Sequence, residues 1–89
     1  MLSVLPLQAQ TDLSEAEQRR FDYYYMESVN SKLRQDYANA YLMLEHCLAI
    51  NPTSAAAYYE LSQYYLMLGQ TPKGMEALEK APNAEELMG

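Results

Sequence analysis

The sequence predicts an all-α fold of antiparallel helix-hairpin repeats with about four helices. The chain matches itself at a spacing of 34 residues, and its apolar and aromatic residues recur at helical spacing between Pro, Gly and capping residues. The pairs that coincide are Tyr24 with Tyr58, Tyr25 with Tyr59, Ser28 with Ser62, Leu44 with Leu78 and Glu45 with Glu79. A fixed period of this length is typical of stacked helix pairs, because each unit buries its apolar face against the next.

The first helix is expected over residues 15–34. Ser14 and Glu17 form an S-x-x-E capping box, in which each side chain accepts a hydrogen bond from the other residue's backbone N–H. One face of this helix carries the apolar and aromatic stripe Phe21, Tyr24, Tyr25, Ser28, Val29 and Leu33. Gln35 and Asp36 form the turn, and the Asp36 carboxylate is expected to cap the next helix.

The second helix is expected from residue 37 to about Ile50. Asn51 and Pro52 end it, because proline disfavours helical geometry in the residue before it. Its packing face consists of Tyr37, Ala40, Tyr41, Leu44 and Leu48, with Cys47 at the edge. Tyr37 and Tyr41 are expected to wedge between helices. The short turns force neighbouring helices to run antiparallel.

The third helix is expected to be capped by Thr53 or Ser54 and to end at Gly69, a left-handed terminator. Its stripe consists of Tyr58, Leu61, Ser62, Tyr65 and Leu68. Thr71 is expected to cap the fourth helix, with Pro72 at its first position. That helix carries Met75, Leu78 and Ala81 and ends before Pro82.

The first ten residues, MLSVLPLQAQ, differ from the rest of the chain. A short apolar run followed by a small residue, Ala9, is typical of the end of a secretory signal. Residues 1–13 are therefore expected to be a disordered lead or a signal-peptide remnant, and residues 14–89 the helical domain. A signal-peptide remnant would place the protein outside the cytoplasm, in the periplasm or at the cell surface. A simple disordered lead would place it in the cytoplasm.

Composition and charge exclude several classes of partner. The chain is 49% hydrophobic and 20% charged, which is typical of a globular domain. The net charge of −6 and the scattered six Lys and Arg residues argue against binding to nucleic acid or to an anionic membrane, since both need clustered cations. No segment approaches the roughly 20 apolar residues that cross a bilayer, so membrane insertion is not expected.

The sequence offers no catalytic, metal or cofactor site, and we predict that the protein is not an enzyme. His46 and Cys47 are the only reactive-looking neighbours. Adjacent residues on a helix point about 100° apart, so they cannot form a nucleophile–base pair. A metal site needs three or four ligands, and the chain has no second His or Cys. Cys47 is expected to be buried and His46 to face outward.

The order of residues resembles the tetratricopeptide repeat (TPR) family. That family has an aromatic, an apolar, a small and an aromatic residue on the first helix, then a small, a bulky and a small residue on the second, and a closing proline. Residues 55–81 match with Tyr58, Leu61, Ser62, Tyr65, Gly74, Leu78 and Ala81, and residues 21–54 match with Tyr24, Ser28, Ala40, Leu44, Cys47 and Pro52. The repeats are expected at about 21–54 and 55–88.

Three positions depart from the family pattern. Glu27 and Ser31 stand where an apolar and an aromatic residue are expected, and Glu86 stands at the closing proline. The stripe of the first helix is therefore expected to rotate toward Phe21, Tyr25, Val29 and Leu33.

The resemblance implies an α-solenoid that acts as a protein-interaction scaffold or adaptor, binding a protein or peptide segment on a concave face. The first helix of each repeat lines that face, which places six residues on it as the partner-binding set: Tyr25, Val29, Lys32, Tyr59, Gln63 and Leu66. Adaptors of this family that clamp a terminal carboxylate use Lys and Asn there, where this chain has Tyr25 and Val29, so an anionic tail is not the expected ligand. A neighbouring repeat or the N-terminal lead covering the same residues is the competing interpretation.

The alternative function is structural. Two repeats fall below the roughly three that usually fold independently. The chain would then be the N-terminal part of a longer exported bacterial TPR protein, or would self-associate, with no independent binding function. The apolar residues that could form such an end face are Met67, Leu68, Met75, Leu87 and Met88.

Overall fold

The computed structural model describes residues 13–81, and all their regular structure is helical. The four helices are α2 (Glu15–Leu33), α3 (Tyr37–Ile50), α4 (Ala55–Met67) and α5 (Thr71–Glu79). Of the predicted N-terminal lead only Leu13 is described, and Glu86, Leu87 and Met88 also lie outside the described residues. Within residues 13–81 there is no strand, and the predicted all-α fold is confirmed.

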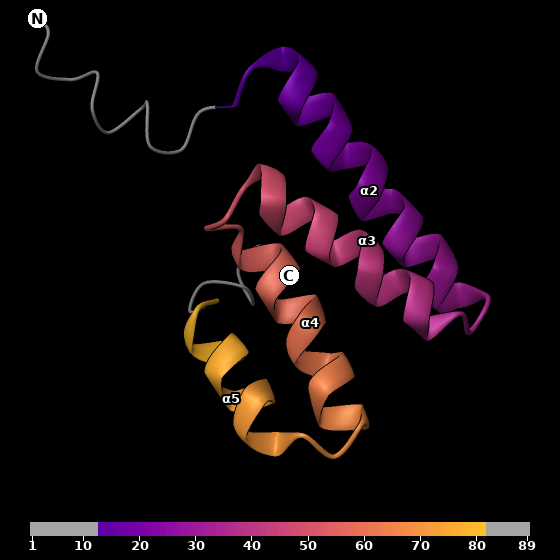
Figure 1. The fold of residues 1–89 in the computed structure, drawn as a ribbon, viewed down its shortest axis with the longest axis vertical. Coiled ribbons are helices and arrows are strands. Elements are labelled where there is room, and N and C mark those ends of the chain that lie inside the picture. Colours follow the sequence, from indigo (N-terminus) through magenta and orange to yellow (C-terminus); the bar gives the residue numbers. More distant parts are fainter. Residues whose placement is uncertain (1–12, 82–89) are drawn as a thin grey trace, which may run out of the picture.

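The helices form two antiparallel hairpins, which Figure 1 shows in chain order. The first hairpin consists of α2 and α3, and the second of α4 and α5. Packing between hairpins runs mainly through α3 and α4. The chain therefore folds as the pair of helix hairpins that its 34-residue period predicts.

Three of the predicted N-terminal caps are confirmed. Each cap side chain accepts a hydrogen bond from the backbone N–H three residues on, which satisfies a donor that has no partner inside the helix. The pairs are Ser14 with Glu17 at 3.0 Å, Asp36 with Asn39 at 3.2 Å and Ser54 with Ala57 at 3.2 Å. The Ser14 N–H also donates to Glu17 at 2.9 Å, which completes the capping box.

The prediction for α5 is wrong at its cap. Thr71 is the first helical residue, and the cap position belongs to Gln70, whose side chain makes no capping hydrogen bond. Pro72, at the second helical position, has no backbone N–H. The first turn of α5 therefore has one fewer N–H group that needs a cap. The proline thus reduces the need for a side-chain cap.

Both hairpins turn through the same left-handed motif. Gly69 has φ 80°, as predicted, and Gln35, one 34-residue repeat earlier, has φ 63°. In each turn the next N–H donates to a carbonyl five residues back, from Asp36 to Ser31 and from Gln70 to Tyr65, both at 2.8 Å. In the second turn, Gly69 suits this backbone because glycine has no Cβ. In the first turn, the Cβ of Gln35 makes the same left-handed conformation sterically unfavourable.

Replacing Gln35 with glycine is expected to stabilise the protein by about 0.5–1 kcal/mol. Removing the Cβ relieves about 1–2 kcal/mol of left-handed strain, and the greater freedom of glycine in the unfolded chain offsets part of this gain. The urea midpoint followed by far-UV circular dichroism measures the change. The matched variant Gly69→Ala should move the midpoint the other way. A loss of stability in Gln35→Gly would contradict the shared turn.

The core lies where the hairpins meet. Its buried residues come from α3 and α4, and aromatic residues of α2 pack against them. The buried members are Ala40, Leu44, Cys47, Ala57, Leu61 and Tyr64. Tyr24, Tyr58 and Tyr65, which belong to the predicted stripes, are each half-buried.

Small residues allow the two helices of each hairpin to approach closely. Ser28 and Ser62 are buried at equivalent positions, and each hydroxyl donates to the carbonyl three residues back at 2.6 Å. A Cβ at Gly74 would lie 2.7 Å from the Leu66 side chain, so glycine is required there unless Leu66 moves. The small residues of the repeat pattern thus lie where the two helices of a hairpin are closest.

Four residues differ from the predicted stripes. Leu33 and Leu68 are exposed, whereas Ser31 and Tyr64 are buried. Leu33 is the last residue of α2 and Leu68 the C-cap of α4, so both lie past the packed part of their helices. The expected α2 stripe is therefore wrong at Leu33, whereas its members Phe21 and Tyr25 do pack against the core.

Ser31 can be buried at low cost because its hydroxyl finds hydrogen-bond partners within the first hairpin. It accepts hydrogen bonds from Asn39 at 2.8 Å and from Arg34 at 3.2 Å. A polar residue thus occupies the place where the second hairpin has Tyr65.

Candidate functional site

Two pairs of tyrosine rings join the hairpins. Tyr37 of α3 lies against Tyr64 of α4, with ring centroids 6.1 Å apart. Tyr41 lies against Tyr65 at 6.0 Å, and their hydroxyls are 3.3 Å apart. That hydrogen bond, together with one to Glu45, raises the pKa of Tyr41. The prediction that Tyr37 and Tyr41 wedge between helices is confirmed.

One ion pair connects α2 with α4. The Lys32 ammonium lies 3.0 Å from the Glu60 carboxylate, whose side chain is only 8% exposed. Burial, and then the charge of Glu60, raises the pKa of Tyr25 and raises the pKa of Tyr64 to about 12. Tyr25, Lys32, Glu60 and Tyr64 therefore form one polar cluster where the first helices of the two hairpins approach.

A pocket of about 540 Å³ lies beside this cluster. It takes its lining from the end of α2, the start of α3 and the end of α4: Lys32, Tyr37, Gln63, Tyr64, Leu66 and Met67. The structure thus brings together three of the six predicted binding residues, Lys32, Gln63 and Leu66.

A second pocket of about 610 Å³ shares Tyr37, Tyr64 and Met67 with the first. The two pockets form a continuous surface at the turn end of the hairpins, which we call the turn-end surface. Its further lining residues are Ala38, Tyr41, Tyr65, Leu68, Gln70 and Lys73. The lining is apolar and aromatic with two lysines and no carboxylate. Met67 and Leu68 are exposed there, which is the usual property of an interaction surface.

The other three predicted binding residues line neither of these pockets. Tyr25 packs against the core and stacks on Phe21, with centroids 6.1 Å apart, while Val29 and Tyr59 are half-buried. The binding role of all six residues stays a prediction. Sequence reasoning missed Tyr37, Tyr64 and Met67 as pocket residues. It placed Tyr37 between helices and Met67 on a possible self-association face, and it singled out Tyr65 rather than Tyr64.

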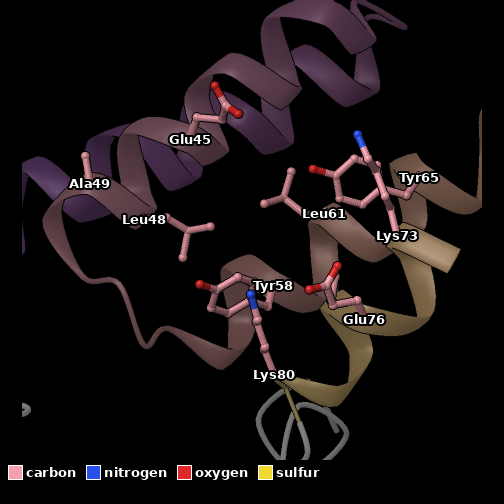
Figure 2. Close-up of a pocket in the computed structure, with 10 residues that line it drawn as sticks. Glu45, Leu48, Ala49, Tyr58, Leu61, Tyr65, Lys73, Glu76 and Lys80 are labelled. Carbon is pink, nitrogen blue, oxygen red and sulfur yellow. The ribbon is translucent and has the colours of Figure 1, made fainter. Parts of the chain in front are cut away.

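A third pocket, of about 510 Å³, lies between α3, α4 and α5 (Figure 2). Lys73 of α5 and Lys80, the C-cap residue of that helix, lie over the rings of Tyr65 and Tyr58, 5.9 Å and 5.5 Å from the centroids. Glu45 and Glu76 also line it, so the charges balance and favour no ionic ligand. His46, the residue equivalent to Lys80, stacks on Tyr24 at 4.7 Å, so equivalent side chains cover the equivalent tyrosines Tyr24 and Tyr58 in the two hairpins.

The described residues do not assemble a reactive site. Cys47 is buried and its thiol donates to the Phe21 carbonyl at 3.8 Å. Burial, with a smaller contribution from Asp22, raises the pKa of the Cys47 thiol to about 11, which keeps it protonated and poorly nucleophilic at neutral pH. Within residues 13–81 no three His, Cys, Asp or Glu side chains gather as metal ligands. None of the described helices has the length and hydropathy of a bilayer span.

A family model described as "Tetratricopeptide repeat" matches residues 33–86. The match contains α3, α4 and α5, and the structure adds α2 as the antiparallel partner of α3. Neither the curated proteins nor the solved structures gave a match. Because the family model covers more than half of the chain, the protein belongs to the tetratricopeptide repeat family, whose members are protein-interaction repeat modules that are generally not catalytic.

Proposed function

We propose that the protein binds a peptide or helix of a partner protein on its concave face, with the turn-end surface as the anchor site. The observation that supports this most directly is the pocket formed by Lys32, Gln63 and Leu66 together with Tyr37, Tyr64 and Met67. Residues from three helices contribute to it, so the site exists only when the two hairpins are docked.

The lining defines the partner's chemistry. Two tyrosine rings and the apolar side chains of Leu66 and Met67 favour an aliphatic or aromatic anchor residue, since such anchors give most of the energy at protein interfaces. Lys32 is already paired with Glu60 and Lys73 lies over the Tyr65 ring, so the lining selects no charged residue next to that anchor. Tyr25, Val29 and Tyr59 extend the proposed contact along the first helices toward their N-termini.

The experiment selects displayed peptides on the wild-type chain and measures their affinity by calorimetry. Met67→Lys is expected to weaken the selected peptides at least tenfold, because a charge replaces an apolar contact at the pocket. Met26→Lys is the matched control, since both methionines are 56% exposed and Met26 lines none of the described pockets.

Amide chemical shifts give a second readout. Bound peptide should shift the resonances of Gln63, Leu66 and Met67 more than those of Met26. Equal losses of affinity in both variants, or shifts centred on the pocket between α3 and α5, would contradict the proposal.

A further inference from the structure

One of the tyrosine pairs between α3 and α4 has the geometry for a covalent link between the hairpins. The rings of Tyr41 and Tyr65 have centroids 6.0 Å apart at an interplanar angle of 74°, and their hydroxyl oxygens are 3.3 Å apart. Each ortho carbon is bonded to the carbon that bears the hydroxyl, so hydroxyls this close bring an ortho carbon of each ring near the other ring. These are the carbons that join when two tyrosyl radicals couple to dityrosine.

A one-electron oxidant would act on tyrosine in this chain. Tryptophan, tyrosine and cysteine are the side chains that lose a single electron most readily. The chain has nine tyrosines and no tryptophan, and its one cysteine, Cys47, is buried. Burial raises the pKa of the Cys47 thiol, which removes its reactive thiolate form at neutral pH. Tyr41 and Tyr65 are half-buried and line the second pocket, so a small oxidant in solution can reach them.

The surroundings of the pair provide a path for the proton that must leave with the electron. Tyr41 is hydrogen-bonded to both Tyr65 and Glu45. A carboxylate only accepts, so Tyr41 donates its single proton to Glu45 and the Tyr65 hydroxyl donates to the Tyr41 oxygen. Lys73 holds its positive charge 5.9 Å from the centre of the Tyr65 ring, which disfavours the loss of an electron there (Figure 2). Tyr41 is therefore oxidised first, with Glu45 taking its proton.

The hydroxyl contact distinguishes this pair from the other close tyrosines. Within residues 13–81 no second pair of tyrosine hydroxyls lies within hydrogen-bonding distance. Tyr37 and Tyr64 also connect α3 with α4, with centroids 6.1 Å apart, but Tyr64 is only 3% exposed, which shields it from an oxidant in solution.

We propose that Tyr41 and Tyr65 are a site of oxidative cross-linking, at which a one-electron oxidant, such as a peroxidase supplied with hydrogen peroxide, converts the pair to dityrosine. Each tyrosine gives one electron to the oxidant and its hydroxyl proton to Glu45 or to water. The two unpaired electrons then form a bond between ortho carbons, and the hydrogen on each of these carbons moves to the phenol oxygen. One molecule of peroxide takes up the two electrons and two protons and leaves as two molecules of water. The fixed pair makes the coupling intramolecular, which favours it over coupling between chains.

The cross-link has a direct consequence for the fold. It joins α3 to α4 and closes a loop over residues 41–65, which restricts the unfolded chain and so stabilises the folded one. The turn-end surface exists only when the two hairpins are docked, and the cross-link keeps them docked. The coupling itself needs only the two rings and an oxidant, so it does not depend on the proposed binding function.

Photo-oxidation of the full chain at 10 μM tests the proposal, with ruthenium(III) tris(bipyridyl), generated by light and persulfate, as the one-electron oxidant. The expected product is a monomer on a denaturing gel that shows dityrosine fluorescence and has lost two hydrogen atoms by mass. Cleavage after glutamate should leave residues 28–45 linked to residues 61–76, because Glu45 and Glu60 separate the two tyrosines. The urea midpoint of the purified product should lie above that of the untreated chain.

Phenylalanine variants assign the link to the pair. Tyr41→Phe and Tyr65→Phe should each lower the yield of the linked monomer at least tenfold, because phenylalanine has no hydroxyl from which to form the radical. Tyr37→Phe is the matched control, since Tyr37 lies on the same helix, faces a tyrosine of α4 at 6.1 Å and is 40% exposed. Its yield should stay within about twofold of the wild type. Each variant keeps the ring, and far-UV circular dichroism verifies its helicity.

Three results would overturn the proposal. One is an equal yield in Tyr41→Phe and Tyr37→Phe. Another is a linked monomer that forms as readily in concentrated urea, where the docked geometry is lost. The third is dityrosine found only between chains.

Discussion

Replacing Leu44 with alanine is expected to leave much of the protein unfolded at 25 °C. Leu44 has no exposed surface, and it lies in the core where α3 meets the helices on both sides. Truncating a buried leucine costs about 2–5 kcal/mol, because the lost apolar contact leaves a cavity that the surroundings fill only in part. A domain of this size is stabilised by about 3–5 kcal/mol in total, so the loss is comparable with the whole. Urea unfolding followed by far-UV circular dichroism measures it.

Two further leucines make the experiment specific. Leu42 lies on the same helix but is exposed, and Leu42→Ala should change the stability by about 0.5 kcal/mol or less. Leu78 is the repeat equivalent of Leu44 and is half-buried, so Leu78→Ala should fall between the other two. If Leu44→Ala and Leu42→Ala cost the same, the core is not where the structure places it.

The sequence was sufficient to predict the helices because their ends are determined locally. The capping box at Ser14 and Glu17, the cap at Asp36 and the terminator Gly69 each act within four residues, and all are present in the structure. Ends without a local signal were harder to predict. Gln35 adopts the left-handed conformation although glutamine does not favour it, so the packing of the first hairpin rather than local preference determines that turn.

The packing between the hairpins was less predictable. A helical stripe allows several neighbouring faces, and the choice between Tyr64 and Tyr65 depends on how α4 is rotated against α3. The structure buries Tyr64 fully and leaves Tyr65 half-buried, the reverse of the predicted order. Tertiary contacts with Tyr37 and Tyr41 fix that rotation, and they depend on residues more than 20 positions away.

The same limit applies to the candidate site. The repeat pattern identifies positions on the first helix of each repeat, and Lys32, Gln63 and Leu66 do line one pocket. Tyr37 and Met67 complete that pocket from the start of one helix and the end of another, where a repeat pattern carries no information. The part of the pocket formed by residues next to the turns could therefore be identified only from the three-dimensional structure.

Replacing Lys32 with methionine is expected to destabilise the protein by about 1–3 kcal/mol. The change keeps the apolar stem but removes the cation that pairs with the buried Glu60 carboxylate, which is left without its partner. The effect is smaller than for a fully buried pair because the Lys32 side chain is 41% exposed. The free energy of unfolding from urea titration gives the value.

A double-mutant cycle separates the pair from the side chains themselves. Glu60→Gln keeps the shape and removes the charge, so combining it with Lys32→Met should cost clearly less than the sum of the two single changes. The pair Arg19–Glu15 is the control, because its side chains lie 4.0 Å apart and are exposed, and its cycle should show no measurable coupling. If the two cycles gave equal coupling, the ion pair between α2 and α4 would be no more than a surface contact. The docking of the two hairpins, and with it the pocket beside Lys32, would then depend on the tyrosine pairs and on the apolar core between α3 and α4.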